Sequence, residues 1–440
     1  MVLKKRLAQM VDGLIVVAAV TMGSLGAMWA APQSARLTAS PMIIGAAAIL
    51  VGAALAWSLG WLIGRKSGRR RRAAAGTTLA TLAVGSLVVW IMNPPPRLYP
   101  PVSVPANIQF WNLPTGSRIA YRRMPGAAPH RPSPVIVMHG GPGAPILPLL
   151  NLVKGDVPFD SLMGLGYDLY FYDQYGAGYS SRADLSHDAP YTVDRQIDDL
   201  EAIRQAIGTQ RLILIGTSWG ATLAARYVLR FPEHVERIVF DSPGPIWFPA
   251  FPQIESPDAN RPLTADERAQ LDVAQRPTPR IVVGRMLAQV NPRAGTRLVK
   301  DWEVDEWFGN SFYAAIQLGQ PRSSCRGVLA APKEYFATMG FFVFNYMVED
   351  AFRLPDPRPE LRKRTLPVLV LRGECDWIRP EIAREYRDVF TSAHLVAVPN
   401  AAHMTWLEQP DLVQRIVAAF LLDKELPTSA DGRDAEEPRK

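Results

Sequence analysis

A serine in a glycine-rich turn is the residue of this 440-residue chain best suited to covalent chemistry. Residues 216–220 read G-T-S-W-G, which matches G-x-S-x-G, and they directly follow the apolar run Leu212–Ile215. A segment rich in Ala and Leu, typical of a helix, begins just after them. A sharp turn from a buried strand into a helix holds such a serine in a strained conformation with its hydroxyl exposed, and the flanking glycines avoid Cβ clashes. The context predicts that Ser218 is a nucleophile rather than a surface serine.

A second glycine-rich segment is suited to stabilising the oxyanion that forms when a carbonyl is attacked. Residues 139–143 read H-G-G-P-G and follow the apolar run Val135–Met138. An oxyanion must be met by backbone N–H donors that are fixed in advance. We expect one donor from Trp219, the residue after the nucleophile, and the other from Gly141. His139 is expected to shape the loop by hydrogen bonding rather than to react.

The base and its orienting acid are expected later in the chain, in the order serine, acid, histidine. A strand predicted over Leu366–Leu371 ends in a loop that contains Glu374 and Asp376. Asp376 is the better acid, and Glu374 is the alternative. Of the two histidines that follow, His394 enters a strand, whereas His403 lies in the loop after that strand. We therefore expect His403 to be the base.

These three side chains predict acyl transfer through a covalent intermediate. His403 would take the proton of Ser218 as the serine oxygen attacks a carbonyl. Asp376 would fix the tautomer of the imidazole and stabilise the imidazolium, and water would then hydrolyse the acyl-enzyme. The sequence has no obvious cluster of metal ligands, so neither a metal nor another cofactor is expected.

The elements that must position these residues alternate along the chain. Short apolar runs predict strands over residues 108–113, 118–122, 135–138, 168–172, 212–215, 238–240, 366–371 and 395–398. Helical patterns lie between them, including residues 193–207, 221–230, 381–390 and 412–422. Most of the strands lack polar alternation, which is typical of parallel strands buried on both faces. The pattern predicts an α/β fold with a doubly wound, mostly parallel sheet.

One long segment interrupts this alternation. Residues 246–365 contain no comparable strand and are rich in Trp, Phe, Pro and Arg. A segment of this length is too long for a connection, so it predicts an inserted helical cap above the carboxyl edge of the sheet. The α/β core would then comprise residues 106–245 and 366–422, and the charged residues 423–440 would form a disordered tail.

The N-terminal part of the chain is far more apolar than the rest. Apolar runs cover residues 11–31, 42–64 and 73–92. About 20 residues of helix cross a hydrocarbon core of about 30 Å, so these runs predict three transmembrane helices, followed by a Pro-rich linker at residues 94–105. A cleaved signal peptide is the alternative for the first run, because residues 4–6 are basic.

Basic residues orient this predicted membrane anchor. Three basic residues precede the first run, and six lie between the second and third, so these parts should be cytoplasmic. Three crossings then place everything after Met92 on the far side of a multi-pass membrane protein, with the lipid bilayer as a partner. Residues 1–93 hold ten of the 48 Lys and Arg but one of the 41 acidic residues, so the net charge of +7 arises in the anchor. The nearly neutral remainder gives no support for nucleic-acid binding.

The chain has two cysteines, Cys325 and Cys375, and both lie in the part expected outside the cytoplasm. A disulfide could persist there. Two unpaired buried thiols are equally compatible with the sequence.

Together the motifs resemble those of the proline iminopeptidase family of α/β-hydrolases. The likeness rests on H-G-G-P-G at residues 139–143, D-Q-Y-G-A-G-Y-S at residues 173–180 and G-T-S-W-G at residues 216–220, and it covers roughly Ile108–Leu422. The resemblance implies an α/β-hydrolase fold and release of an N-terminal residue, often proline, from short peptides. Related members also cleave esters or amides. The chain departs from the family in having Tyr175 in place of the usual Arg.

The resemblance also implies that acids of the cap bind the free amine of the substrate. The candidates are Asp301, Glu303, Asp305 and Glu306, although the same residues fit a solvated surface. Two other functions remain open. One is an esterase or small-amide hydrolase with the same triad, acting on a small molecule, and the other is a non-catalytic membrane scaffold.

Overall fold

The computed structural model describes residues 2–67, 70–97, 103–152, 157–185, 191–321, 324–325 and 332–427. The chain divides into two compact units. The first holds the N-terminal helices, a short stretch that begins at Asp184, and residues Pro277–Val304. The second holds the remaining described residues, including every residue of the predicted triad.

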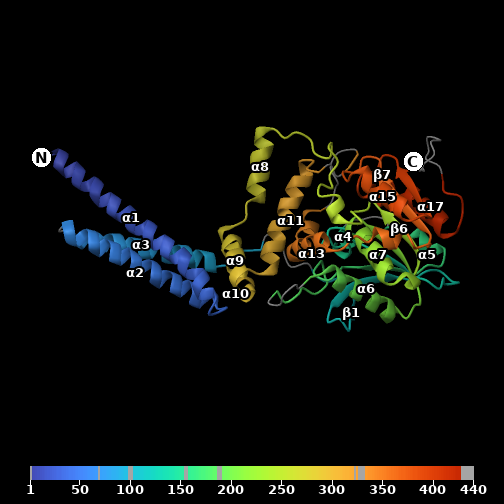
Figure 1. Ribbon diagram of the computed structural model, residues 1–440, viewed down its shortest axis with the longest axis horizontal. Coiled ribbons are helices and arrows are strands. Elements are labelled where there is room, and N and C mark those ends of the chain that lie inside the picture. The colour runs from blue at the N-terminus through green and yellow to red at the C-terminus, as the bar shows by residue number, and fades with distance from the viewer. Residues whose placement is uncertain are drawn as a thin grey trace. The chain divides into compact units, whose positions relative to one another are not determined.

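A sheet of eight strands organises the second unit (Figure 1). The strands are β1 (Gln109–Asn112), β2 (Arg118–Met124), β3 (Val135–Met138), β4 (Leu169–Tyr172), β5 (Leu212–Thr217), β6 (Val235–Asp241), β7 (Val368–Gly373) and β8 (Ala393–Val398). Their order is β1-β2-β4-β3-β5-β6-β7-β8. Strand β2 pairs antiparallel with β1 and β4, whereas strands β3 to β8 pair in parallel. The carboxyl ends of the parallel strands therefore share one edge, where the predicted site residues lie.

Helices cover both faces of this sheet. They are α4 (Leu147–Leu152), α5 (Ser161–Gly164), α6 (Val193–Ile207), α7 (Trp219–Arg230), α15 (Pro380–Val389), α16 (Thr405–Glu408) and α17 (Pro410–Leu421). Helix α6 begins at the N-cap Thr192, whose side chain accepts from the backbone N–H of Arg195, and it ends at Gly208, which has a φ of 80°. These capping signals are local in the sequence, so the boundaries of α6 can be read from the sequence alone.

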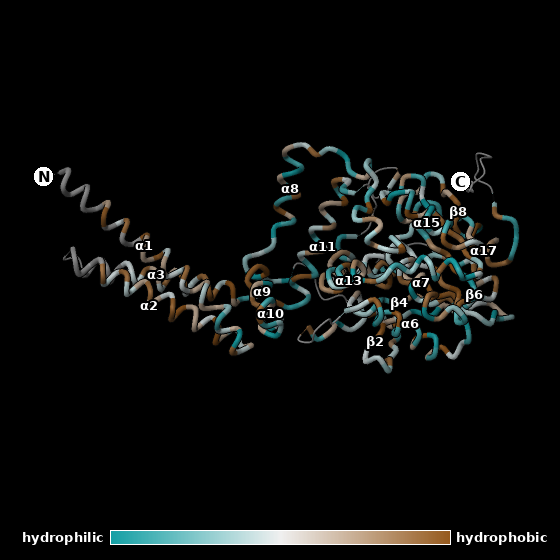
Figure 2. Tube along the Cα trace, in the orientation of Figure 1, coloured by the Kyte–Doolittle hydropathy of each residue, from teal (hydrophilic) through white to brown (hydrophobic). Residues whose placement is uncertain are grey.

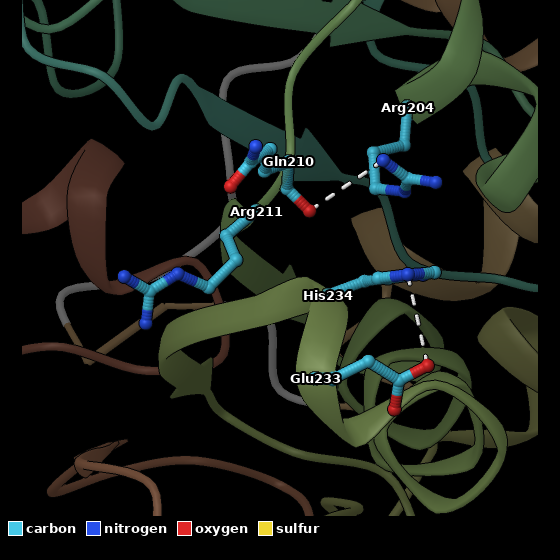
Figure 3. Close-up of a pocket in the computed structure, with 5 residues that line it drawn as sticks. All are labelled: Arg204, Gln210, Arg211, Glu233 and His234. Carbon is cyan, nitrogen blue, oxygen red and sulfur yellow. Dashed lines mark hydrogen bonds and ion pairs between the residues drawn. The ribbon is translucent and has the colours of Figure 1, made fainter.

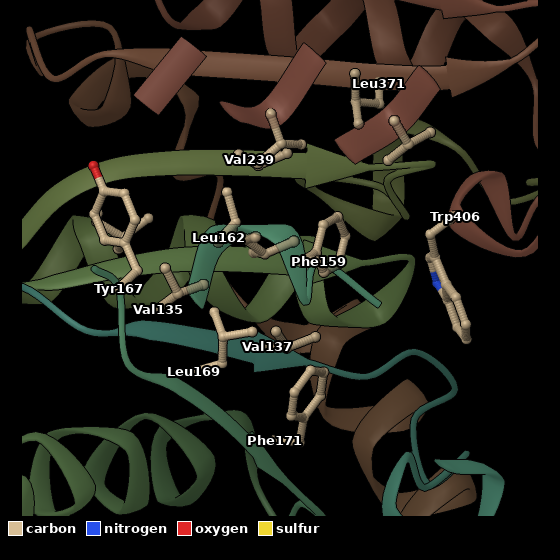
Figure 4. Packing of buried hydrophobic residues seen from close by; sticks show 14 of the residues in the cluster. Val135, Val137, Phe159, Leu162, Tyr167, Leu169, Phe171, Val239, Leu371 and Trp406 are labelled. Atoms are coloured by element: carbon tan, nitrogen blue, oxygen red, sulfur yellow. The ribbon is translucent and has the colours of Figure 1, made fainter. Parts of the chain in front are cut away.

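The main hydrophobic core lies between one face of the sheet and helices α5 and α17. Val135, Val137 and Phe171 point to this face and pack with Leu162 of α5 (Figure 4). On the opposite face, the ring of Phe240 packs against the ring of Tyr386 at a centroid distance of 4.5 Å. Because both faces are covered, the strands read as continuous apolar runs, and fully burying each such side chain contributes about 1.5–3 kcal/mol.

The structure confirms the predicted strands and helices of the core. The largest boundary difference is in β6, which begins at Val235, three residues before the predicted start. Glu236 and Arg237 interrupt the apolar run, but Arg237 still pairs with Ile213 of β5. Backbone pairing extends a strand through charged residues that an apolar pattern cannot detect.

The segment predicted as a cap is helical. It contains α8 (Ala265–Gln275), α9 (Pro279–Val290), α10 (Pro292–Leu298), α11 (Asp301–Gln317), α12 (Lys333–Phe336), α13 (Phe341–Arg353) and α14 (Arg358–Leu361). However, α9 and α10 belong to the first unit, so the cap is not one contiguous body. The Asn291 amide donates to the carbonyl of Ala35 over 2.8 Å, and the Arg280 guanidinium donates to the carbonyl of Ile91. Side chains of this segment thus satisfy carbonyl groups at the ends of N-terminal helices, which have no partner within those helices.

The first unit is built around three long helices, α1 (Val2–Ala35), α2 (Pro41–Ser67) and α3 (Arg70–Met92). Small residues lie where the helices meet, including the buried Ala19, Ala56 and Ala80. A Cβ on Gly52 would lie 2.7 Å from the carbonyl oxygen of Gly23, so the backbones of α1 and α2 approach closely. Apolar residues recur along all three helices (Figure 2), and many of the large ones are exposed.

Among the described residues, one helix is long and apolar enough to cross a membrane by itself. It covers Pro41–Leu62, and the apolar stretch Gly76–Met92 is shorter. Three transmembrane helices are therefore not shown, because parts of the predicted spans 11–31 and 73–92 fall outside the described side chains.

Two predicted segments lie partly outside the described residues. In the linker, this applies to residues 98–102, and in the C-terminal tail to residues 428–440. The described start of the tail contacts the core, since Asp423 forms an ion pair of 2.6 Å with Arg237.

Candidate active site

Ser218 lies in a strained turn between β5 and α7. Its φ is 54° and its ψ is −116°, a conformation that L-residues rarely adopt. Glycines on both sides make the turn possible. A Cβ on Gly220 would lie 2.3 Å from the carbonyl oxygen of Met138, and one on Gly216 would lie 2.5 Å from the carbonyl oxygen of Gly220. The turn places Ser218 at the carboxyl edge of the sheet, at the N-terminus of α7.

His403 and Asp376 form a hydrogen-bonded pair at the same edge. Asp376 follows β7, His403 follows β8, and the Nδ1 of His403 lies 3.0 Å from Oδ1 of Asp376. The carboxylate is also held by the backbone N–H of Ile378, which donates to it over 3.0 Å. Burial lowers the pKa of His403, but the carboxylates of Asp376 and Asp241 outweigh this effect and raise the pKa above its usual value. With Nδ1 directed to Asp376, the other nitrogen of the imidazole remains for a proton transfer.

The H-G-G-P-G loop lies against the nucleophile. A Cβ on Gly140 would be 3.0 Å from Cβ of Ser218, which is tighter than ordinary van der Waals contact. Gly141 has a φ of 113°, which requires glycine. The loop therefore brings backbone, rather than side chains, next to the serine.

His139 anchors this loop as a neutral imidazole. Its Nε2 accepts from the backbone N–H of Gln174 over 2.8 Å, and its Nδ1 lies 2.9 Å from the carbonyl oxygen of Gly140. Burial lowers its pKa to about 4. The tautomer with the proton on Nδ1 satisfies both contacts, which agrees with the predicted shaping role of His139.

Asp173 explains much of the D-Q-Y-G-A-G-Y-S motif. Its buried carboxylate accepts from the backbone N–H groups of Ile146, Leu147 and Tyr179, each over 2.9 Å. Burial raises its pKa to about 7 against these hydrogen bonds. A Cβ on Gly178 would lie 2.0 Å from this carboxylate. The motif thus braces the start of α4, the helix that follows the H-G-G-P-G loop.

A cavity of about 460 Å³ opens above these residues. Ser218, His403, Trp219 and Gly141 line it, and most of the other lining side chains are apolar. The aromatic members of the lining besides Trp219 are Phe248, Phe251, Phe312, Phe336, Phe344, Phe352, Tyr335, Trp377 and Trp406. The volume is within the range of sites for small organic ligands.

Comparison with known proteins identifies the family. The alpha/beta hydrolase fold family matches residues 133–410. The chain belongs to the α/β-hydrolase fold family.

Relatives of this α/β-hydrolase include proline iminopeptidases. That of Lactobacillus delbrueckii subsp. lactis is 32% identical over 326 residues, which cover 71% of this chain and 98% of the relative. That of Heyndrickxia coagulans is 26% identical over 320 residues, covering 70% of this chain and 96% of the relative. The crystal structure of proline iminopeptidase from Mycobacterium smegmatis has 24% identity and a TM-score of 0.49, covering 72% of this chain and 98% of that one. The similarity to these two curated relatives supports a hydrolase.

The acids predicted to bind a substrate amine lie on α11 and are absent from the described lining of the cavity. Glu303 forms a buried ion pair of 2.7 Å with Arg280. Asp305 pairs with Arg182 over 3.1 Å and accepts from the backbone N–H of Phe341. Glu306 is buried. Glu303 and Asp305 are therefore engaged in ion pairs within the fold.

Two acids near the site were not predicted from the sequence. Asp241 ends β6 and is fully buried beside the predicted triad, and Glu255 is the one carboxylate among the described residues that line the cavity. The position of Asp241 at the carboxyl end of a predicted strand was a usable signal. Glu255 lies outside the named strands, in an isolated β-bridge with Ile378, and no sequence pattern distinguishes it.

A disulfide joins Cys325 of the cap to Cys375, the residue before Asp376. This contact resolves the two alternatives for the cysteines. The neighbouring Ser324 hydroxyl donates to Glu408, whose carboxylate also accepts from the backbone N–H of Ala402 over 2.6 Å. The cap is thus tied to both loops that carry the acid and the base.

A second hollow lies at the opposite edge of the sheet. It is lined by Arg204, Gln210, Arg211, Glu233 and His234 (Figure 3). Arg204 and His234 already contact Glu201, at 2.6 and 3.0 Å. The residues that line it precede β5 and β6, far along those strands from Ser218, so this hollow has no part in the site.

Proposed function

We propose that this α/β-hydrolase is a serine hydrolase that acts through an acyl-enzyme. The observation that carries the proposal is that the strained Ser218 and His403 line one cavity, while Asp376 holds the Nδ1 side of His403 over 3.0 Å. Ser218 attacks a carbonyl while His403 accepts its proton, and Asp376 stabilises the resulting imidazolium. His403 then protonates the leaving group, and water attacks the acyl-enzyme with His403 again as the base.

The oxyanion of each tetrahedral intermediate is met by the backbone N–H groups of Trp219 and Gly141. Trp219 begins α7, so its N–H has no partner within the helix and the positive end of the helix dipole lies beside the oxyanion. Two observations support the N–H of Gly141 as the second donor. Gly141 lines the cavity, and it belongs to the loop that contacts Ser218. Such donors are worth most where burial excludes water.

For the substrate, we propose a short peptide or aminoacyl compound with a free N-terminal amine. The relatives named proline iminopeptidase support this class. Within the described lining of the cavity, Glu255 is the one group that could pair with an ammonium. Its neighbours are held to the acid loop, because the backbone N–H of Ser256 donates to the carbonyl of Trp377 over 2.7 Å. The carboxylate of Glu255 therefore supplies a negative charge near the site. The rest of the lining favours an apolar N-terminal side chain.

The variant Glu255→Gln tests this proposal. Removing the charge should lower kcat/KM for proline p-nitroanilide and other aminoacyl p-nitroanilides about 10- to 100-fold, because a hydrogen bond to a charged group contributes about 1.5–3 kcal/mol. Hydrolysis of p-nitrophenyl butyrate, which has no amine, should be unchanged. Asp266→Asn, at an exposed acid on α8, is the matched control. Equal activity of the Glu255→Gln and wild-type enzymes on aminoacyl substrates would contradict the role of Glu255.

The aromatic lining favours a second candidate, an esterase or small-amide hydrolase for apolar acyl groups. Each buried CH₂ contributes about 0.8 kcal/mol, so kcat/KM would then rise about fourfold per added carbon along a series of p-nitrophenyl esters. Activity on these esters together with no release of any N-terminal residue would favour this candidate over the aminopeptidase.

We also propose that the N-terminal helices form a multi-pass membrane anchor with the hydrolase outside the cytoplasm. Large apolar side chains of these helices are exposed, whereas small residues fill the helix contacts, a pattern suited to lipid. Trp29 and Trp90 are exposed near one end of the bundle, and Trp57 and Trp61 near the other, as in the aromatic belts of membrane proteins. The disulfide supports an oxidising compartment for the catalytic residues.

A further inference from the structure

A second buried carboxylate lies at the centre of the site. Asp241 is the last residue of β6, and it pairs with Thr217 of β5 on one side and with Leu371 of β7 on the other. Strand β5 leads into Ser218, and β7 leads into the loop of Asp376. Asp241 therefore lies between the strand of the nucleophile and the strand of the acid, and none of its surface is exposed.

Asp241 is hydrogen-bonded to both catalytic segments. Its Oδ2 accepts from the hydroxyl of Thr217 over 3.1 Å, and its backbone carbonyl accepts from the N–H of Ser218 over 3.0 Å. Its Oδ1 accepts from the hydroxyl of Thr405 over 2.5 Å. Thr405 is fully buried and lies two residues after His403. One carboxyl group thus connects the nucleophile turn to the loop of the base.

We propose that Asp241 is a positioning residue of the serine hydrolase reaction, which holds the Ser218 turn and the His403 loop in register and adds a second negative charge to stabilise the imidazolium. The inference rests on the proposed serine mechanism. Both side-chain partners of Asp241 are neutral hydroxyls, and among the described residues no ion pair joins it to an Arg or Lys. Within the described part of the chain, no permanent cation therefore neutralises the charge of Asp241, and this charge acts on His403, the titrating group nearby.

The titration of the cluster is consistent with this role. The pKa of Asp241 is raised to about 6, mainly by burial; the hydroxyls of Thr405 and Thr217 and the charge of His403 act against this rise, and the charge of Asp376 adds to it. Asp241 is then ionised above pH 6, in the range where His403 must accept a proton. The charged groups that face His403 are Asp376 and Asp241, and both raise its pKa against the effect of burial. The loss of activity at low pH therefore reflects the coupled titration of His403 and Asp241.

The variant Asp241→Asn separates charge from shape. In the full-length protein, we expect the pH at half-maximal labelling by a fluorophosphonate to fall by about half to one unit, because the imidazolium loses one of two nearby charges. The labelling rate at pH 8 should fall about tenfold. Asp388→Asn, at an acid whose side chain is 59% exposed, is the charge-matched control and should behave as wild type.

The variants Thr405→Val and Thr405→Ser test the hydrogen bond alone. Val removes the donor and leaves the charge, so the labelling rate should fall while the midpoint of the pH profile stays in place. Ser restores the hydroxyl and should recover most of the rate. These variants also keep the test open if Asp241→Asn fails to fold.

The outcomes distinguish this inference from the mechanism beneath it. Absence of pH-dependent labelling in the wild-type protein would contradict the serine mechanism itself. Normal labelling of the wild type, combined with an unshifted midpoint in a folded Asp241→Asn variant, would overturn the role of Asp241 alone. A wild-type rate in Thr405→Val would overturn the proposed link to the base.

Discussion

At the scale of single residues, the site depends on a few groups held in unfavourable states. Ser218 has a positive φ, and the buried carboxyl groups of Asp173 and Asp241 have raised pKa values. Each of these states costs free energy, and the surrounding fold must supply it. Backbone strain and buried charge are typical of functional sites, because they preorganise groups for one geometry.

The raised pKa of His403 predicts the pH dependence of catalysis. The base must be neutral to accept the proton of Ser218, so kcat/KM should rise with pH through an ionisation above the usual histidine value of about 6.5. In Asp376→Asn, the midpoint should fall and kcat should drop by several orders of magnitude, because the imidazolium loses its partner. Initial rates from pH 5 to pH 9 measure both effects. A midpoint that stays fixed when Asp376 is neutralised would contradict the pairing of Asp376 with His403.

The sequence constrains the choice of catalytic residues more tightly than the choice of binding residues. Ser218, Asp376 and His403 were chosen because each falls in a loop after a predicted strand, in the chain order of the fold, and the structure brings His403 and Asp376 into contact. The acids of α11 had no such constraint. Acidic residues on a helix fit an ion pair, a cap or a binding site equally well, and only the folded packing reveals their partners.

At the scale of elements, glycines determine how closely the site segments approach one another. A Cβ on Gly220 would lie 2.3 Å from the carbonyl oxygen of Met138, at the end of β3, which is too close for any side chain. The turn after β5 and the loop after β3 thus meet through backbone alone. This contact depends on the pairing of β3 with β5, which are distant in sequence.

The variant Gly220→Ala should therefore disrupt the site. The new methyl group overlaps backbone that cannot move independently of the sheet, and overpacking of this kind costs about 1–3 kcal/mol. We expect a lower midpoint of thermal unfolding and loss of fluorophosphonate labelling in the fraction that remains folded. Gly164→Ala is the control, because nothing lies within 4 Å of a Cβ there. Normal stability of Gly220→Ala would show that the loop and the turn are further apart than described.

Elements with strong local signals were predicted with accurate boundaries. Helix α6 begins and ends at the predicted residues, Val193 and Ile207, because its N-cap threonine and C-terminal glycine lie in the sequence. By contrast, the division of the cap between two units could not be predicted. It depends on contacts of Arg280 and Asn291 with carbonyl groups about 190 and 256 residues away along the chain, and no local pattern encodes such contacts.

At the scale of the whole molecule, part of the cap folds together with the N-terminal helices. Residues Pro277–Val304 belong to their unit, and Arg280 also pairs with Glu303 within it. If the helices anchor the chain in a bilayer, as we propose, this part of the cap lies near the membrane surface. The N-terminal helices would then support the cap as well as anchor the enzyme.

Membrane fractionation tests the anchor. The full-length chain should remain in the membrane pellet after extraction with alkaline carbonate, because exposed apolar side chains of the helices are stable only in lipid. In sealed spheroplasts, added protease should cleave the hydrolase but not a tag at the N-terminus. Release of the chain by carbonate would contradict the anchor, and protection of the hydrolase would contradict its orientation.

The central claim is that Ser218 is a nucleophile activated by His403, and active-site labelling tests it most directly. The full-length protein is treated with a fluorophosphonate and digested, and the modified peptide is identified by mass spectrometry. We expect one adduct per chain, located on Ser218, with none in Ser218→Ala and very little in His403→Ala. Full labelling of the Ser218→Ala variant, or an adduct on another serine of the wild-type protein, would contradict this claim.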